Sequence, residues 1–356
     1  MSISAAFPAD ITTAIVTHNS SASLARVLDA VAATGCPASR TLIVDVASTD
    51  GTGEIASSRL GAAQVRRLDV NDGPNPARNE ALRLAGTPYV LLMDADVLLT
   101  PDAPAALRRA MRSDIAVCAP IVVHASQPDV IQYGGGGVHF ICEAVNTWMD
   151  RSVAARGMDD SDIGAAPGAA LLIEVEKAQA VGGFDERYFL GKEDGDFLHR
   201  LRIAGYRLRE TPAARVLHDT RPRSTWLFEY QVRNRWHFLL RNYELRTLIL
   251  LAPALAVHEV LQLAVLIVKG HGAAWLRGCR GLRRLLPSLS RDRARVRRFR
   301  RVGDRHLFSA DPLVVRADVG GAGVFKGAYD AWLRGYWRVV RPLIDGRRDV
   351  DRFGQA

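Results

Sequence analysis

Runs of apolar and β-branched residues alternate with helix-like segments over the first hundred residues, and this alternation limits the fold more than any other feature. The apolar runs cover residues 11–17, 41–44 and 89–93. Helix-type spacing of apolar residues covers 22–34, and a further helix begins at 77. Strands that alternate with helices form a mostly parallel central sheet with helices on both faces. The sequence therefore predicts an α/β domain.

A polar residue stands at the end of each of these runs. Thr17, Asp45 and Asp94 occupy the three strand ends. In open α/β sheets, ligands bind just outside the carboxyl ends of the strands. We therefore expect these three side chains to lie along one edge of the sheet, at a ligand site.

Asp94-Ala95-Asp96 is the most specific of these polar segments, because two carboxylates one residue apart can lean toward one ligand. Hard oxygen ligands suit Mg²⁺ or Mn²⁺, which stabilises the charge that builds on a leaving phosphate. Such a pair is also common among loop and helix-capping residues. The presence of Asp45, of Arg78-Asn79 at a helix start and of a later acidic cluster favours the metal interpretation.

The pattern becomes less regular after residue 115. It predicts a strand over 115–123, a flexible turn at Gly134 to Gly137 and a glycine-broken strand over 164–173. A helix over 197–204 and a strand that ends at His218 complete this part of the chain.

Positive charge is concentrated in one segment. The chain has a formal net charge of +9, and Arg277 to Arg301 holds eleven arginines against a single acid, Asp292. The remainder is close to neutral, so the basic composition does not describe a nucleic-acid groove. We expect no nucleic-acid partner.

An apolar stretch over 245–268 directly precedes the arginines, and this order is typical of an anchor on an anionic membrane surface. Pro253 and the pair His258-Glu259 interrupt it. A carboxylate at mid-bilayer costs roughly 2.5–3.5 kcal/mol, so a peripheral or monotopic element fits better than a spanning helix. A buried helical hairpin with a solvated arginine face is the alternative.

These features divide the chain into three parts: a catalytic domain over 1–222, a membrane-associating region over 223–302 and a C-terminal helical tail over 303–356. The N-terminus lacks the basic and then apolar pattern of a signal peptide. The four cysteines lie far apart and are interpreted as small buried residues. We expect the protein at the cytoplasmic face of the cell membrane.

Several motifs occur in an order that resembles the family 2 glycosyltransferases of GT-A fold, over roughly residues 10 to 220. The first half contains Thr17-His18-Asn19, Asp45-Val46-Ala47-Ser48-Thr49-Asp50-Gly51-Thr52, Ala77-Arg78-Asn79 and Asp94-Ala95-Asp96. The second half contains Gly182-Gly183-Phe184-Asp185-Glu186, Glu193-Asp194, the basic segment Arg200 to Tyr206, and His218. Val46 stands where the family usually has Asn. The hydrogen bond that this Asn side chain would make near the nucleotide is therefore in question, whereas both acids of the motif are present.

The resemblance implies a metal-dependent, inverting transfer of a hexosyl or deoxyhexosyl group. The donor would be a nucleotide-diphosphate sugar, and the acceptor a glycan or a polyprenyl-linked glycan. It places Asp45 at the nucleotide base, Asp94 at the ribose and Arg78 at the base or diphosphate. The remaining implied donor-site residues are Thr17, Asn19, Asp50 and Asn79, and the implied ligands of Mg²⁺ or Mn²⁺ are Asp96, Asp94 and His218. For these residues, a cap, turn or local pairing role is the alternative.

An inverting transfer needs a carboxylate that takes the proton of the attacking acceptor hydroxyl. Asp194 is the candidate, with Glu193 beside it and Asp196 close by. The sequence leaves open which of the three faces the acceptor. It also leaves open that the cluster only caps the helix near Phe197, a role that suits Asp196 best.

Arg233, Arg235 and Trp236 are candidates for contact with a lipid-linked diphosphate, since they lie between the catalytic domain and the apolar stretch. Inward packing of the aromatic residues is the alternative. A non-catalytic membrane-bound scaffold of the same fold is the competing function, distinguished by its lack of metal-dependent activity on nucleotide sugars. Two other enzyme classes match the sequence poorly. A dehalogenase-type phosphatase would carry its Asp-x-Asp on the first strand, whereas Asp94-Ala95-Asp96 follows a later one. A nicotinamide site would need Gly-x-Gly-x-x-Gly after the first strand, where residues 18–23 contain no glycine.

Overall fold

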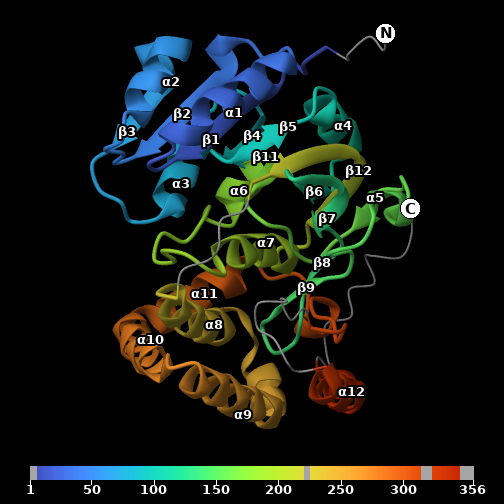
Figure 1. Ribbon diagram of the computed structural model, residues 1–356. Coiled ribbons are helices and arrows are strands. Elements are labelled where there is room, and N and C mark those ends of the chain that lie inside the picture. Colours follow the sequence, from blue (N-terminus) through green and yellow to red (C-terminus); the bar gives the residue numbers. More distant parts are fainter. Residues whose placement is uncertain (1–5, 220–224, 314–322, 345–356) are drawn as a thin grey trace.

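The computed structural model describes residues 6–219, 225–313 and 323–344. Its first part is the predicted run of parallel strands, ordered β3-β2-β1-β4, with helices packed against them (Figure 1). The elements are β1 (Ile11–Thr17), α1 (Ser21–Ala33), β2 (Thr41–Val46), α2 (Thr52–Leu60), β3 (Val65–Leu68), α3 (Pro74–Leu84) and β4 (Tyr89–Asp94). The predicted α/β class and GT-A-like arrangement are confirmed.

The sheet continues beyond β4 with mixed strand directions. β11 (Ala170–Glu174) lies between β4 and β6 (Ile115–His124) and runs antiparallel to both. β12 (Arg207–His218) pairs with β6 in parallel, with an irregular register between Thr211 and Arg215. The other elements of this half are β5 (Val97–Leu99), α4 (Ala103–Ala110), β7 (Gln127–Tyr133), α5 (Val153–Arg156), β10 (Ser161–Asp162), α6 (Val175–Ala180) and α7 (Glu193–Ile203).

Two predictions for this half were wrong in detail. The glycine run was predicted as a flexible turn, but β8 (Gly136–Val138) pairs with β9 (Ala144–Asn146) in a small second sheet. Helix α7 begins at Glu193, four residues earlier than predicted, because its acidic first turn is compatible with the positive end of the helix. Asp196 therefore lies inside the helix and does not cap it.

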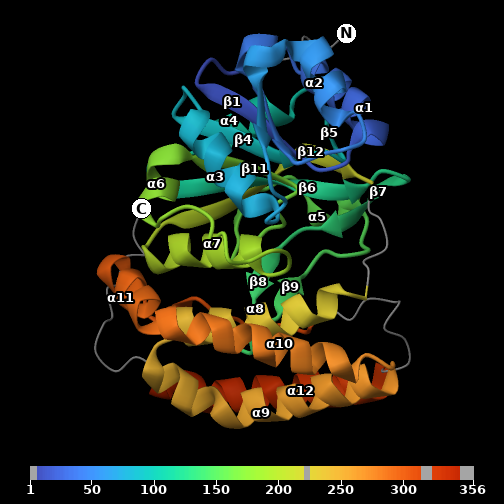
Figure 2. The same ribbon diagram turned by 90° about the vertical axis from the view of Figure 1, so that its left-hand side faces the viewer.

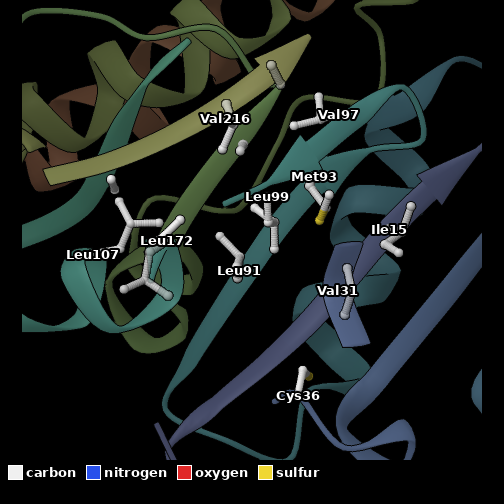
Figure 3. Close-up of a cluster of buried hydrophobic side chains, with 14 of the residues drawn as sticks. Ile15, Val31, Cys36, Leu91, Met93, Val97, Leu99, Leu107, Leu172 and Val216 are labelled. Carbon is white, nitrogen blue, oxygen red and sulfur yellow. The ribbon is translucent and has the colours of Figure 1, made fainter. Parts of the chain in front are cut away.

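Alternate side chains of the central strands pack on opposite faces of the sheet. On one face, Ile15 of β1 and Met93 of β4 contact Val31 of α1 in one apolar cluster (Figure 3). On the other face, Ala14 packs with Phe197 of α7 in a second cluster. Because both faces are buried, the strands read as continuous apolar runs, and only their ends are free to carry polar groups.

The C-terminal part is a layer of helices on the far side of α7 from the sheet (Figures 1 and 2). Its members are α8 (Leu227–Asn242), α9 (Leu245–Val268), α10 (Gly272–Leu285), α11 (Leu289–Phe299) and α12 (Gly323–Val340). One apolar cluster joins all three predicted domains: Phe140 stacks on Trp337 with ring centroids 5.0 Å apart, and Phe238 and Leu251 belong to the same cluster. The domain limits stay predictions, and the one at 222 lies outside the described residues.

Candidate active site

Asp45 lies at the end of β2, directly beside Thr17 at the end of β1. Its Oδ1 accepts hydrogen bonds from Thr17 Oγ1, at 3.1 Å, and from Ser48 Oγ. Arg67 of β3, which the sequence reasoning missed, reaches Asp45 Oδ2 at 3.4 Å. These partners bury Asp45 completely. Asp45 therefore lies just behind the rim of the sheet, and its contact with a nucleotide base stays a prediction.

Asn19 and Asp50 organise the two loops at this rim. Asn19 has a φ of 48°, and its Oδ1 accepts a hydrogen bond from the backbone N–H of Thr49 at 2.9 Å. Asp50 accepts hydrogen bonds from the backbone N–H groups of Ser21, at 3.0 Å, and Thr52, at 3.1 Å. The Thr52 hydroxyl also donates to Asp50. This hydrogen bond is the main reason why the pKa of the Asp50 carboxyl lies well below its usual range. Asp50 thus joins the starts of α1 and α2, which is the turn role that the sequence left open.

Arg78 of α3 joins two carboxylates that are a hundred residues apart in the chain. Its Nη1 donates to Asp194 Oδ1 at 2.5 Å, and its Nη2 donates to Asp94 Oδ1 at 3.3 Å. The guanidinium is only 3% exposed. Burial disfavours its charge, but Asp194, Asp94 and Glu193 outweigh this and raise the pKa of Arg78. The structure therefore brings the ends of β4 and α7 together around a permanent cation.

Gly168, just before β11, fits closely against this group and was missed by the sequence reasoning. Its backbone N–H donates to Asp194 Oδ2 at 2.8 Å. A Cβ at this position would lie 2.4 Å from Asp194 Oδ1 and 2.6 Å from Arg78 Nη2. Only glycine allows the backbone this close to the ion pair. The break in the apolar run over 164–173 was the available signal.

Asp96 and His218 face each other beside Asp94. His218 Nδ1 lies 2.7 Å from Gln132 Oε1, and its Nε2 lies 3.5 Å from Asp96 Oδ1. The amide oxygen only accepts, so Nδ1 carries a hydrogen. Burial lowers the pKa of His218, but the hydrogen bonding and charge of Asp96, with the charges of Asp94 and Asp219, outweigh it and raise this pKa. Asp96 Oδ1 is shielded from solvent and faces Nε2. A carboxylate oxygen opposite an imidazole nitrogen is compatible with a divalent cation between them.

This pair has the chemistry of a metal site but does not complete one. Among the described residues, no three His, Cys, Asp or Glu side chains form a metal-binding group. Asp94 is directed toward Arg78, and its role as a ligand stays a prediction. Mg²⁺ in particular is commonly bound by one or two carboxylates together with substrate phosphates. Asp96 and His218 fit that pattern.

Two carboxyls at this site hold their protons more tightly than usual. Burial raises the pKa of Asp94 to about 6, with further increases from Asp194 and Asp96 that Arg78 partly offsets. Burial, together with the charge of Asp194, raises the pKa of Glu193 to about 7. Glu193 is buried, and its Oε2 has no hydrogen-bond partner. Carboxyls with perturbed pKa values cluster at active sites.

Exposure separates the three acids at the start of α7. The side chain of Asp194 is 21% exposed, whereas those of Glu193 and Asp196 are buried. Asp196 accepts hydrogen bonds from Arg200 and Asn242, each at 2.8 Å. The predicted capping role of Asp196 was therefore wrong, because its carboxylate is used in a buried ion pair. Asp194 alone of the three presents an accessible carboxylate.

Asn79 holds the turn that contains the Gly-Gly-Phe-Asp-Glu motif. Its Oδ1 accepts from the backbone N–H of Phe184 at 2.8 Å, and its Nδ2 donates to the Phe184 carbonyl at 2.9 Å and to Glu186 at 2.8 Å. Both ends of the amide thus bind within the protein. A contact between Asn79 and the nucleotide sugar stays a prediction.

The residues proposed for acceptor contact are used inside the molecule. Arg235 is fully buried and forms an ion pair with Glu259 of α9. Trp236 Nε1 donates to the same carboxylate at 2.8 Å, and Arg233 Nη2 donates to the Arg187 carbonyl at 2.8 Å. The prediction for Arg235 and Trp236 is corrected accordingly: the carboxylate in the apolar helix needs buried donors, and these side chains supply them.

Comparison with known proteins agrees with this geometry. The model described as Glycosyl transferase family 2 matches residues 12–148, and the model described as Glycosyl transferase family group 2 matches residues 89–287, more than half of the chain. Together the two matches include the ends of β1, β2, β4 and β12 and the start of α7.

The chain is also similar to two proteins of Mycobacterium tuberculosis. It is 34% identical to pre-mycofactocin glycosyltransferase over 152 residues, 42% of this chain and 30% of that protein. It is 30% identical to N-acetylglucosaminyl-diphospho-decaprenol L-rhamnosyltransferase over 201 residues, 50% of this chain and 65% of that protein. The chain thus matches less than two thirds of the length of either relative.

Among solved structures, that of GalNAc-T7 with UDP, GalNAc and Mn²⁺ superposes with a TM-score of 0.54. The two share 16% sequence identity, and the match covers 66% of this chain and 48% of that chain. At this identity the likeness concerns the fold. Taken with the family matches and the grouping of Asp94, Arg78 and Asp194 at the sheet edge, it completes the assignment: the chain belongs to the family 2 glycosyltransferases.

Proposed function

We propose that the protein is a metal-dependent, inverting glycosyltransferase that uses a nucleotide-diphosphate sugar as donor. The observation that carries this proposal is the bridge of Arg78 between Asp94 and Asp194, with the pair Asp96 and His218 alongside. The bridge joins a donor-side carboxylate at the end of β4 to an accessible carboxylate at the start of α7. A sugar held between them would meet both groups.

Asp96 and His218 are the residues that would hold Mg²⁺ or Mn²⁺, with the donor diphosphate supplying further oxygens. When bound, such an ion stabilises negative charge on a leaving diphosphate. The solvent-shielded Asp96 oxygen, which faces His218 Nε2 at 3.5 Å, supports this assignment. The GalNAc-T7 structure, of the same fold, contains UDP and Mn²⁺.

Asp194 is the proposed general base. It accepts hydrogen bonds from Arg78 and Gly168, which fix the orientation of its carboxylate, and its side chain remains partly exposed to solvent. A carboxylate so placed takes the proton of an acceptor hydroxyl while that oxygen attacks the anomeric carbon opposite the leaving diphosphate. Glu193 is less suited to this step because its side chain is buried, whereas that of Asp194 is partly exposed.

The proposed acceptor is a glycan or a lipid-linked glycan, reached at the cytoplasmic face of a membrane. Helix α9 has a mean hydropathy of 2.0 and leaves most of its side chains exposed. Its large exposed apolar residues are Leu245, Ile249, Val257, Val260, Leu261, Val265, Ile267 and Val268. The decaprenol-linked substrate in the name of one relative supports a lipid-linked acceptor.

The contacts of Glu259 favour a helix that lies on the membrane over one that spans it. Arg235, Trp236 and Trp275 all donate to this carboxylate from α8 and α10. Figure 2 shows α9, α10 and α12 extended side by side along the lower face of the molecule. A spanning α9 would have to leave these partners and carry its carboxylate into the hydrocarbon.

Incubation with a panel of UDP-, GDP- and dTDP-sugars, with Mn²⁺ or with EDTA, tests the proposal. Release of the nucleoside diphosphate from one donor, with Mn²⁺ only, is expected. The Asp194→Asn variant should lose this release by about 10²- to 10⁴-fold, the usual contribution of a general base, and still bind the nucleotide in a thermal-shift assay. No release from any donor would support a non-catalytic scaffold, and near-normal turnover of Asp194→Asn would remove Asp194 from the mechanism.

A further inference from the structure

His258, near the middle of the apolar helix α9, is largely buried and contacts the catalytic part of the molecule. Its Nε2 lies 3.4 Å from Glu143 Oε1, in the turn between β8 and β9. Its Nδ1 lies 3.0 Å from the hydroxyl of Tyr329 on α12. An ionised carboxylate only accepts, so Nε2–H donates to Glu143 and the Tyr329 hydroxyl donates to Nδ1. The neutral imidazole thus links two helices of the C-terminal layer to the small sheet.

Glu143 connects His258 to Lys192, the residue that directly precedes α7. Its Oε2 accepts from Lys192 Nζ at 2.9 Å, and the same ammonium donates to the Cys142 carbonyl at 2.6 Å. Burial would raise the pKa of Glu143, but Lys192 and His258 outweigh it and hold this pKa well below its usual range. The carboxylate therefore stays charged between its two partners.

The backbone at this junction is strained. Lys192 has a φ of 70° and Cys142 a φ of 64°, values that non-glycine residues rarely adopt. Such conformations persist where surrounding contacts fix them, and they cluster at functional sites. Lys192 immediately precedes Glu193 and Asp194, so its conformation sets the direction in which α7 begins.

The neighbouring residue of α9 reaches the same segment by a second route. Glu259 forms an ion pair with Arg235 of α8. Asn234, the residue before Arg235, donates to the carbonyls of Leu190, at 3.0 Å, and Gly191, at 2.6 Å. His258 and Glu259 of α9 are thus both connected to residues 190–192. This convergence explains why a histidine and a glutamate interrupt an otherwise apolar helix.

We propose that His258, Glu143 and Lys192 are positioning residues, which hold the first turn of α7 so that Asp194 meets Arg78 and Gly168. The inference rests on the proposed function, in which Asp194 is the base. Misplacement of a reacting group by about 1 Å can lower the rate about 10²-fold. Loss of this contact should therefore lower kcat while leaving donor binding at β1, β2 and β4 intact.

The test uses the full chain with His258→Ala and Glu143→Gln, and with Arg246→Ala as a control at an exposed position near the start of the same helix. For the nucleotide sugar that the wild type hydrolyses, kcat should fall about 10- to 100-fold in His258→Ala at unchanged KM. Glu143→Gln keeps an acceptor for Lys192 and should lose less. The control should match the wild type.

Hydrogen–deuterium exchange gives a readout that does not depend on turnover. Amides of residues 190–196 should exchange faster in His258→Ala, whereas those of β1 and β4 should not change. Wild-type kcat together with wild-type exchange at 190–196 would overturn the inference. Faster exchange throughout the sheet would also overturn it, since this would indicate general destabilisation. A wild type that acts on no donor would refute the proposed function, and exchange at 190–196 would still decide the positioning role.

Discussion

Gly168→Ala tests whether the spacing around Arg78 controls catalysis. The added Cβ would lie 2.4 Å from Asp194 Oδ1 and 2.6 Å from Arg78 Nη2, whereas ordinary contact begins at 3.4 Å. Moving the Asp194 oxygen to that distance requires a shift of about 1 Å. Neither group can move freely, because Arg78 is buried between two carboxylates. A displacement of this size lowers kcat by about 10²-fold.

Gly195→Ala is the matched control. Gly195 follows Asp194 in α7, and a Cβ there meets no atom within 4 Å. Alanine in a helix interior is about 0.5–1 kcal/mol more favourable than glycine, so this variant should be fully active and slightly more stable. The assay is release of nucleoside diphosphate from the donor, with nucleotide binding followed by thermal shift. If Gly168→Ala kept wild-type kcat, the distances around Arg78 would not be what limits the reaction.

Three other predictions follow from the site and the C-terminal layer. Asp96→Asn should raise the Mn²⁺ concentration needed for half-maximal activity at least tenfold, because one charged ligand is lost; an unchanged metal dependence would exclude Asp96 as a ligand. The pKa of Glu193 is raised from 4.5 to about 7. Its contribution to stability is therefore complete below pH 4.5 and is lost as the pH rises through 7. Because glutamine does not titrate, Glu193→Gln should flatten the decline of Tm between about pH 5 and 8. An equal decline in both proteins would refute the raised pKa. The double variant Ile249→Lys, Val260→Lys, at positions 65% and 66% exposed on α9, should no longer sediment with anionic vesicles. The control Met158→Lys, at a position 60% exposed on the catalytic part, should still do so. Sedimentation of the α9 variant would contradict the proposal that this face of α9 binds the membrane.

The first half of the fold could be predicted from sequence because local signals agree there. Strands β1, β2 and β4 are largely apolar runs, and each has a polar residue, Thr17, Asp45 or Asp94, at or next to its end, whereas β3 carries two exposed arginines. The boundaries of β1 were predicted to the residue, and those of α1 and β4 within one. The polar ends could be placed on one edge because parallel strands share their direction.

The second half was harder because its structure depends on distant partners. The glycine run at 134–137 looks like a loop, and only the pairing with β9 makes it a strand. Strand β12 contains Pro212 in an irregular stretch, and its pairing with β6 shifts register there, which the sequence does not indicate. Helix α7 begins at Glu193, directly after Lys192, whose backbone is in the left-handed region. No local sequence pattern indicates such a conformation at a lysine.

The candidate site was predicted at the level of residue types, and its connections were not. Asp94 and Asp194 were both named, but nothing in the sequence indicated that Arg78 would join them. Arg235 was a candidate for acceptor contact because it lies between the catalytic domain and the apolar stretch, whereas the structure buries it against Glu259. Pairings of this kind depend on tertiary contacts that spacing along the chain does not encode.

The position of β11 also has a consequence for how the chain folds. Among the strands that the structure describes, β11 alone links β4 to β6 in the hydrogen-bonded sheet, and both of these strands are synthesised before it. The parallel unit from β1 to β4 can form as soon as it emerges, but it exposes the unpaired edge of β4 until β11 arrives to close it. Such long-range pairing slows folding and leaves an edge open to wrong partners. Overproduction of any fragment that stops before residue 170 should therefore yield aggregates, even though that fragment contains most of the donor site.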